Sequence, residues 1–420
     1  MKKNRLTIYI LLAMALGIVA GYAVHEFASP EFITPFSKNI NLLGKVFIRL
    51  VQMIIAPLVF STLVVGIAKL GDLKAVGRVG GKAILWFISA SLVSLLLGLV
   101  LVNIFKPGHY IDLSQADTEG VKDLMKNTPA FSLEKFVEHI IPRSVIEAMA
   151  TNEILQLVVF SIFFGVALTT LGDYAKPLIK ALDIVSHVIL KMVGYVMNFA
   201  PLGVFGALTA VVATKELGLF KFYLVYFAFF LLGILVLWII LLGVGTMILG
   251  PKRIADLLKR IGGPLLIAFS TTSSEAVFPK LTEELERFGC KNKIVSFGLP
   301  PGYSFNLDGS MMYMTFASLA IAQAYGVHLD LSTQLTMLLV LMITSKGIAG
   351  VPRASLVIVL ATCAMFGIPP EGVAIILPID HFCDMFRSMT NVIGNALATS
   401  VVSKWEGELG PSESGTAAEA

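Results

Sequence analysis

A helical stripe of polar side chains inside the apolar segment 372–402 has the residue types of a binding site. Its members are spaced by 4, 3, 4 and 4 residues and comprise Asp380, Asp384, Arg387, Asn391 and Asn395. Because a helix turns by about 100° per residue, all of them fall on one narrow face. Ionisable groups at a membrane helix centre cost about 2.5–3.5 kcal/mol each on insertion scales, so this face needs a polar partner. An ion pair that only locks helices together is the alternative interpretation.

Two residues of this stripe define the chemistry of the ligand. The planar guanidinium of Arg387 matches a carboxylate, and Asp384, one turn earlier, can accept hydrogen bonds from an ammonium group. An amino acid with an acidic side chain carries both charges. We expect the amide of Asn391 and the backbone N–H groups of two hairpin tips to hold its main-chain carboxylate, because half-helix ends attract anions.

A second polar interruption lies in the apolar segment 294–322, which contains the sequence YSFNLDGSMMY. Asn306, Asp308 and Gly309 stand where a membrane helix normally has apolar residues. Unwound backbone at that depth is tolerated only when it is buried in protein or faces a water-filled cavity. We expect the carbonyls freed at 306–309 to face a cation or a proton-bearing water beside the stripe.

The elements that position these groups are membrane helices. The chain has 420 residues, 56% hydrophobic and 14% charged, with a mean hydropathy of +0.84, which indicates an integral membrane protein. A transmembrane helix needs about 20 apolar residues, and six segments qualify: 7–27, 41–68, 81–105, 153–172, 183–213 and 219–249. The net charge of +4 reflects basic loops and gives no indication of nucleic-acid binding.

The distribution of Lys and Arg predicts the orientation in the membrane. Basic segments at the amino terminus, 69–82, 173–180 and 251–260 alternate along the chain as cytoplasmic segments should. Both termini are therefore expected in the cytoplasm, with the long polar insert 106–150 on the opposite side. The small, polar segment 406–420 is expected to be a disordered tail.

Two interrupted segments in the second half predict re-entrant hairpins. The first runs through GGPLLIAFSTTSSEAVF (262–278), and the second has apolar arms on either side of SKGIAGVPRAS (345–355). Neither has an arm long enough to cross alone. Each hairpin is followed by a long segment with polar groups at its middle, which is the pattern of an inverted repeat in a transporter.

Glu275 lies in the first of these tips. Burial disfavours the charged form of a carboxyl, so Glu275 is a candidate proton carrier. The cysteines number three, at unrelated spacings, and predict neither a disulfide framework nor a metal site. No cofactor is expected.

These motifs resemble the dicarboxylate/amino acid:cation symporter family, which includes the glutamate transporters and their bacterial relatives, closest to the proton-glutamate/aspartate symporters. The resemblance covers about 7–405. It is most specific in four motifs that occur in the family's order: STTSSEAVFP, NLDGS, GIAGVPRAS and DHFCDMFRSMTNVIGN.

The resemblance implies an all-α membrane fold of eight transmembrane helices plus two re-entrant helical hairpins. It implies a homotrimer in the bacterial inner membrane, surrounded by lipid. Residues 1–80 and 111–215 would form the scaffold, and residues 81–110 and 216–405 the transport domain. The transport domain would move like an elevator, with the second hairpin as the extracellular gate.

The resemblance also assigns roles to individual residues. Arg387 would bind the side-chain carboxylate of the substrate and Asp384 its amino group. The remaining substrate contacts would come from Asn391, Ser273, Ser274, Ser310, Gly350, Val351 and Ser388. Ion or proton coupling would involve Asp308, Asn306, Glu275, Asp380 and Asn395.

Departures from the family pattern favour protons over sodium. Sodium-coupled members have an acid where this chain has Asn395, and Tyr, Thr and Ser where it has Phe87, Ala90 and Ser91. Na⁺ is a hard cation that needs several oxygen ligands. We therefore predict proton coupling through Glu275 or Asp308, with sodium coupling as the alternative.

Other functions are weighed against this one. A C4-dicarboxylate symporter is the nearest, although such relatives tend to have a small hydroxyl residue in place of Asp384. A neutral amino acid carrier would leave Arg387 without a partner. An intramembrane aspartyl enzyme needs two carboxyls that converge from separate elements, whereas Asp380 and Asp384 are one turn apart, and no HExxH, GxSxG or P-loop motif occurs. A channel would lack a saturable, stoichiometric flux.

Overall fold

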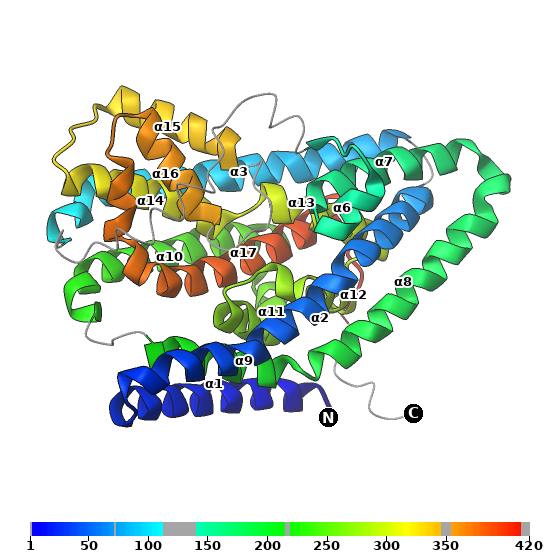
Figure 1. Cartoon of the computed structure of the whole chain (residues 1–420). Coiled ribbons are helices and arrows are strands. Elements are labelled where there is room, and N and C mark those ends of the chain that lie inside the picture. Colours follow the sequence, from blue (N-terminus) through cyan, green and yellow to red (C-terminus); the bar gives the residue numbers. More distant parts are fainter. Residues whose placement is uncertain (1, 71–72, 112–139, 215–218, 346–353, 413–420) are drawn as a thin grey trace.

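The computed structural model describes residues 2–70, 73–111, 140–214, 219–345 and 354–412. Within these ranges the named elements are α-helices and short 3₁₀-helices, and an isolated β-bridge joins Cys290 to Leu409. Figure 1 shows the chain as long helices that cross one another at varied angles. The all-helical prediction is confirmed for this part of the chain.

The described helices are divided between the two halves of the chain. The first half contains α1 (Lys2–Phe27), α2 (Pro30–Leu70), α3 (Leu73–Phe105), η1 (Pro107–Tyr110), α6 (Val145–Thr151), α7 (Ile154–Thr170), η3 (Gly172–Ala175), α8 (Lys176–Met197) and α9 (Ala200–Thr214). The second half contains α10 (Leu219–Leu249), α11 (Pro251–Thr271), η4 (Glu275–Val277), α12 (Phe278–Phe288), α13 (Asn292–Phe305), α14 (Asp308–Ala324), α15 (Leu331–Thr344), α16 (Ala354–Met365), η6 (Pro370–Ile375) and α17 (Leu377–Trp405).

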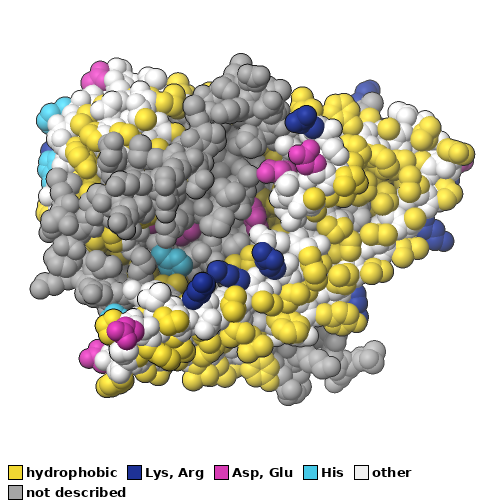
Figure 2. Space-filling model, in the orientation of Figure 1, with side chains coloured by type: hydrophobic (Ala, Val, Ile, Leu, Met, Phe, Trp, Pro, Cys, Tyr) yellow, Lys and Arg dark blue, Asp and Glu magenta, His cyan; other side chains and the backbone are white. Residues whose placement is uncertain are grey.

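Several helices are long and apolar enough to cross a membrane. Four described segments qualify singly, namely Ile8–Phe27, Pro30–Ala68, Lys74–Phe105 and Tyr223–Leu249. A fifth qualifies if the bent pair around α8 and α9 counts as one span. Exposed apolar side chains cover much of the surface in Figure 2, as expected of a protein surrounded by hydrocarbon. Phe163, Ile239 and Met247 are examples, with 73%, 71% and 87% of their surface exposed.

One predicted span is not a single helix. The segment 183–213 is divided between α8 and α9, which meet at an angle of 49°. Pro201, the second residue of α9, has no N–H to donate, and its ring clashes with the carbonyl of the preceding turn, which favours a bend at this point. The hydrophobicity of the segment, on which the prediction of one span rested, does not report this bend.

The helices pack in two groups. In the first, α2 packs against α7, α8 and α9, and α1 packs against α9. In the second, α17 packs against α10, α11, α13 and α14, and α3 packs against α14. The groups meet where α13 contacts α2 and α7, where α11 contacts α1 and α9, and where α12 contacts α2 and α8. The boundaries of a scaffold and a moving transport domain stay a prediction.

Both interrupted segments fold as pairs of helices that pack on each other. Hairpin 1 consists of α11, η4 and α12, and its chain turns at Thr272, a residue with left-handed φ of 52°. Hairpin 2 consists of the arms α15 and α16, which also pack against each other. Its apex, with Gly350 and Val351, lies outside the described residues.

The break predicted at the NLDG motif is present. α13 ends at Phe305 and α14 begins at Asp308. Between them Asn306 (φ −122°, ψ 59°) and Leu307 (φ −98°, ψ 61°) leave helical geometry. The broken span therefore brings two helix ends, with their unpaired backbone groups, to the middle of the bundle.

The chain after α17 is ordered further than we expected. Residues 406–412, assigned from sequence to a disordered tail, continue as a defined segment; residues 413–420 lie outside the described part of the chain. Gly407 has a φ of +71°, and the N–H groups of Gly407 and Glu408 donate to the carbonyls of Lys404 and Ser403. These two bonds form a Schellman motif, which ends the helix and turns the chain back.

Candidate substrate and cation site

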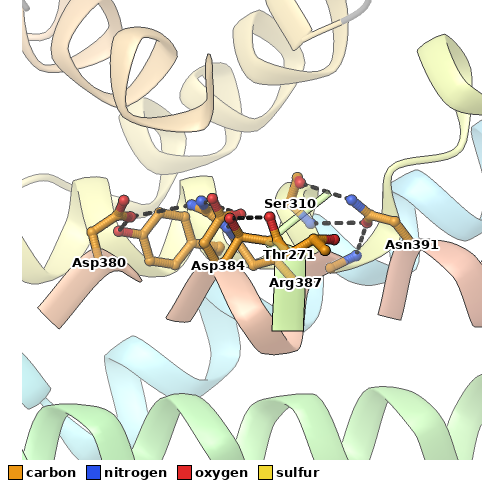
Figure 3. Close-up of polar contacts among 9 residues, drawn as sticks. Thr271, Ser310, Asp380, Asp384, Arg387 and Asn391 are labelled. Atoms are coloured by element: carbon orange, nitrogen blue, oxygen red, sulfur yellow. Dashed lines mark hydrogen bonds and ion pairs between the residues drawn. The ribbon is translucent and has the colours of Figure 1, made fainter. Parts of the chain in front are cut away.

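The guanidinium of Arg387 is the centre of the polar stripe on α17. It is almost fully buried, with 1% of its surface exposed. Its Nη2 lies 2.7 Å from Asp384 Oδ1, and its Nη1 lies 3.4 Å from Asp380 Oδ1. Asp380 and Asp384 therefore flank the cation, as the spacing of 4 and 3 residues predicts. The pairs are visible in Figure 3.

Tyr313 completes the surroundings of Arg387, and the sequence analysis did not identify it. The guanidinium lies over the Tyr313 ring, 4.1 Å from its centroid, and the Tyr313 hydroxyl donates to Asp380 Oδ1 at 2.6 Å. An aromatic face attracts a cation, most strongly where water is excluded. Tyr313 belongs to the quoted stretch YSFNLDGSMMY, so its position one turn after the break was an available signal.

The two carboxylates around Arg387 differ in access. The side chain of Asp380 is 3% exposed, whereas that of Asp384 is 21% exposed. Asp380, bonded to Tyr313 and Arg387, fixes the guanidinium from the closed side. Asp384 lies at the open side, so it can also accept from a ligand. This geometry separates a supporting carboxylate from one that is available for recognition.

Asn391 links α17 to the start of α14. Its Oδ1 accepts from the backbone N–H groups of Gly309 and Ser310, at 2.9 and 3.3 Å, and its Nδ2 donates to Ser310 Oγ at 3.1 Å (Figure 3). The predicted residues Asn391 and Ser310 are thus brought together. Here Asn391 satisfies the unpaired N–H groups of a helix start.

Glycines allow α17 to approach the break closely. A Cβ on Gly309 would lie 2.7 Å from the Arg387 carbonyl oxygen and 2.8 Å from Thr390 Cβ. A Cβ on Gly394 would collide with Asp308 Oδ2. Larger residues at these positions would separate the stripe from the NLDG motif. Gly309 was predicted as part of the break, whereas no role was predicted for Gly394.

A second polar group surrounds the break, one turn further along α17. Asn306 and Asp308 have no exposed surface, and Asn395 is 1% exposed. Asn306 Nδ2 donates to Asn395 Oδ1 at 3.4 Å. Asn306 Oδ1 and Asn395 Nδ2 find no hydrogen-bond partner within the described residues, which is costly for buried amides and indicates a place for a further polar group.

The third-span positions considered for cation binding lie beside this group. Ser91 Oγ donates to the carbonyl of Phe305, the last residue of α13, at 3.3 Å. Ala90 is buried and supplies no side-chain oxygen. The structure therefore brings the third span to the break, where Ser91 contacts the end of α13 and Ala90 adds no side-chain oxygen.

The remaining predicted residues are placed as follows. Ser273 Oγ accepts from the N–H of Ala276 at 3.2 Å, and Ser274 precedes η4, whose first residue is Glu275. This tip packs against α2 as well as α11. Near the apex, α11 faces α17 through Phe269 and Phe386, whose ring centroids are 5.0 Å apart. Ser388 is buried on α17.

Comparison with known protein sequences identifies the family of this chain. A sequence model described as "Sodium:dicarboxylate symporter family" matches residues 6–405. The chain belongs to this family. A "Proton/sodium-glutamate symport protein" of Geobacillus stearothermophilus is 38% identical over 416 residues, covering 97% of this chain and 96% of the relative.

Other members of the sodium:dicarboxylate symporter family bear a different name. A "C4-dicarboxylate transport protein" of Bacillus subtilis (strain 168) is 38% identical over 418 residues, covering 98% of this chain and 96% of the relative. Another "C4-dicarboxylate transport protein", from Acinetobacter baylyi, is 40% identical over 412 residues, covering 95% and 91%. This chain is accordingly a symporter and a multi-pass membrane protein. The comparisons include relatives of both substrate names.

Proposed function

We propose that this protein imports an acidic amino acid, L-glutamate or L-aspartate, together with protons. The observation that supports this most is the pair on α17, a buried guanidinium with a carboxylate at its open side. Arg387 can bind the side-chain carboxylate of the substrate, and Asp384 its ammonium group. A dicarboxylate without an ammonium group would place a second carboxylate beside Asp384, which is repulsive.

The charges of the site support cation coupling. The two neighbouring polar groups together contain three carboxyls, those of Asp308, Asp380 and Asp384, and one guanidinium, so the ionised site has excess negative charge before an acidic substrate binds. Uncompensated charge is expensive in a membrane interior. Protons or cations must therefore bind with the substrate to keep the loaded site close to neutral. This supports symport rather than uniport.

The buried amides support protons as the coupling ion. Asn395 and Ala90 contribute fewer oxygens than a tight sodium site requires. Asp308 and Glu275 are the carboxyls that we propose as proton carriers. The relatives named for both proton and sodium keep sodium coupling as the alternative.

The wider architecture is also a proposal. We expect eight spans, two re-entrant hairpins, a homotrimer and an elevator-like movement, in a bacterial inner membrane with both termini cytoplasmic. The family membership supports these expectations.

Uptake into proteoliposomes tests the substrate and the ion separately. We expect labelled glutamate or aspartate to accumulate with an imposed pH gradient in sodium-free buffer, and unlabelled succinate to compete poorly. Full accumulation driven by Na⁺ at symmetric pH, without a response to the pH gradient, would disprove proton coupling. Succinate uptake that exceeds glutamate uptake would favour the C4-dicarboxylate alternative.

Substitution of Asp384 tests the ammonium ligand. Asp384→Asn should weaken glutamate uptake by about 10- to 100-fold, because a charge-assisted hydrogen bond is lost. Uptake of succinate should not fall in parallel. Asp173→Asn is the control, since Asp173 is an exposed acid whose side chain is 90% accessible. Improved glutamate uptake by Asp384→Ser would show that this assignment is wrong.

A further inference from the structure

The segment after α17 crosses the ends of three other elements. We name residues 405–412 the strap. Its backbone pairs with the turn between α12 and α13: Gly410 N donates to Gly289 O at 2.8 Å, and Lys291 N donates to Glu408 O at 3.3 Å. The β-bridge between Cys290 and Leu409 lies between these two bonds. The strap thus adds a short strand-like pairing to a helical protein.

Ion pairs secure the same turn. The carboxylate of Glu408 lies 2.8 Å from Lys291 Nζ and 2.5 Å from Lys293 Nζ. The pKa of Glu408 is held below its usual value by hydrogen bonds from Lys291 and Lys293. One carboxylate therefore pairs with two cations at the start of α13.

Arg253 connects the strap to both arms of hairpin 1. It lies on the first turn of α11, and its Nη1 donates to the carbonyl of Phe288, the last residue of α12, at 3.2 Å. Its Nη2 donates to Gly410 O in the strap, and its guanidinium lies 4.6 Å from the Phe288 ring centroid. Ser412 Oγ adds a bond to Asp256 Oδ2 at 2.6 Å. The two arms are therefore tied at their open end.

The other end of the strap holds α3. Glu406 Oε1 lies 2.7 Å from Lys82 Nζ, and Glu406 Oε2 lies 3.0 Å from Arg78 Nη2. Lys82 Nζ also donates to the Trp405 carbonyl at 2.9 Å. The Glu406 side chain is 4% exposed, so this contact is shielded from water on the carboxylate side. α3 carries Ala90 and Ser91 to the cation site.

We propose that the strap is a fastener that keeps hairpin 1, α3, α13 and α17 in one fixed arrangement. Hairpin 1 carries Ser273 and Ser274, α3 carries Ser91, and α17 carries Arg387, so the strap maintains the spacing of site groups from a distance. Its residues are positioning residues and do not touch substrate. The benefit to transport rests on the function proposed above, whereas the fastening itself is a property of the chain alone.

Amide hydrogen exchange measured by mass spectrometry tests the fastening. The full chain in lipid nanodiscs, without substrate, is compared with Arg253→Gln and with a chain that stops after Gly407. We expect exchange at residues 251–260 and 281–290 to accelerate by at least about tenfold in both variants, because charge-assisted bonds at the base are lost. Exchange in α15 and α16 should not change.

Two matched controls separate the strap from general effects. Lys252→Gln removes the same charge from the neighbouring, exposed residue, and a chain that stops after Ser412 keeps the strap. Both should exchange like the parent. Unchanged exchange in the chain that stops after Gly407, or equal acceleration in hairpin 2, would overturn the proposal. If the shorter chain does not fold, Glu408→Gln provides the test, because it keeps the backbone contacts.

Uptake by the same variants separates this proposal from the proposed function. If amide exchange in hairpin 1 is faster in the strap variants but the protein does not import an acidic amino acid, the role of the strap is supported and the proposed function is wrong. If amide exchange is unaltered in the strap variants but the protein imports glutamate, the role of the strap is wrong and the proposed function is supported.

Discussion

The two hairpins differ in how they are held. The first arm of hairpin 1, α11, buries its apolar residues, among them Ile254, Leu257, Ile261 and Ile267, and its base is tied by Arg253 and the strap. The first arm of hairpin 2, α15, exposes an apolar row at intervals of four residues: Leu331 (62%), Leu335 (43%), Leu339 (63%) and Ile343 (52%). Hairpin 1 is built into the bundle, whereas hairpin 2 covers it from outside.

Among the residues that the structure describes, hairpin 2 has polar contacts at the start of its first arm. Asp330 caps α15 by accepting from the N–H of Thr333 at 3.0 Å. Gln334 Oε1 accepts from Asn103 Nδ2 of α3 at 2.7 Å, and Gln334 Nε2 donates to Leu329 O at 2.8 Å. These contacts hold the first arm at one end.

This difference indicates which hairpin can open. Segments with few buried contacts open at lower free energy than segments in the core. Hairpin 1 would have to break the contacts of Arg253 with Phe288 and with Gly410 of the strap to separate its arms. Hairpin 2 exposes an apolar face on α15, so we expect the access path to the site to open on its side.

Substitution of two glycines at the hairpin bases is expected to have the largest effect on stability. Gly289 follows α12 with a φ of +110°, and a Cβ there would lie 2.5 Å from Gly410 O and 2.8 Å from Pro411 O. Gly367 follows α16 with a φ of +68°, and a Cβ there meets no heavy atom within 4 Å. Both substitutions to Ala carry the backbone cost of a left-handed residue, about 1–2 kcal/mol.

Gly289→Ala should cost clearly more than Gly367→Ala. The added methyl group collides with strap backbone, so the strap contacts are lost in addition, for a total of about 3 kcal/mol. Thermal unfolding of the purified chains, followed by tryptophan fluorescence, measures the difference. Equal losses in the two variants would mean that the strap is not pressed against hairpin 1.

The contact between Asn103 and Gln334 gives the next effect. Asn103→Leu leaves the buried Gln334 carbonyl oxygen without this donor, at a cost of about 1–3 kcal/mol. Amide exchange in α15 should accelerate while exchange in α11 stays at the parent rate. Thr336→Ala serves as the control, because within the described part of the chain the Thr336 hydroxyl bonds only to Ser332 O of its own helix. Acceleration in α11 would show that the two hairpins are coupled rather than separately held.

Much of the site followed from the sequence because its signals are local. The stripe from Asp380 to Asn395 is a matter of helical spacing, and the break at Asn306 stands out against apolar neighbours. Hydrophobicity does not report a bend, so the division at Pro201 was missed. Tyr313 resembled an ordinary apolar residue until the packing of α14 on α17 placed its ring below Arg387.

The strap could not be predicted, because its meaning depends on distant partners. Glu408 and Gly410 lie in a small, polar tail whose composition is typical of disorder. Their partners Lys291 and Gly289 are more than a hundred residues earlier. Only Gly407, after the last helical turn, was a local signal that α17 ends in a defined turn.

Acidification is expected to have the smallest effect on stability. A different carboxylate is involved at each hairpin, so the effects on the two hairpins can be distinguished. Hydrogen bonds from Lys291 and Lys293 lower the pKa of Glu408 in the strap, and hydrogen bonds from Thr333 and Ser332 lower that of Asp330. A lowered folded pKa means that the stabilisation is complete above the unfolded value, about 4 for these acids, and is lost as pH falls through the folded value.

Glu408→Gln should therefore remove only the pH-dependent part of the stabilisation that the strap gives to hairpin 1. At pH 7 the variant should exchange faster than the parent at 281–290, by a modest factor because partly exposed ion pairs contribute at most about 1 kcal/mol. The two should converge as the pH falls below about 4. Asp330→Asn should accelerate amide exchange at the start of α15 and leave amide exchange at 281–290 at the parent rate. A pH-independent difference between Glu408→Gln and the parent would show that the charge of Glu408 does not hold the strap, and that the contacts of the strap with Gly289, Arg253 and Asp256 fasten hairpin 1.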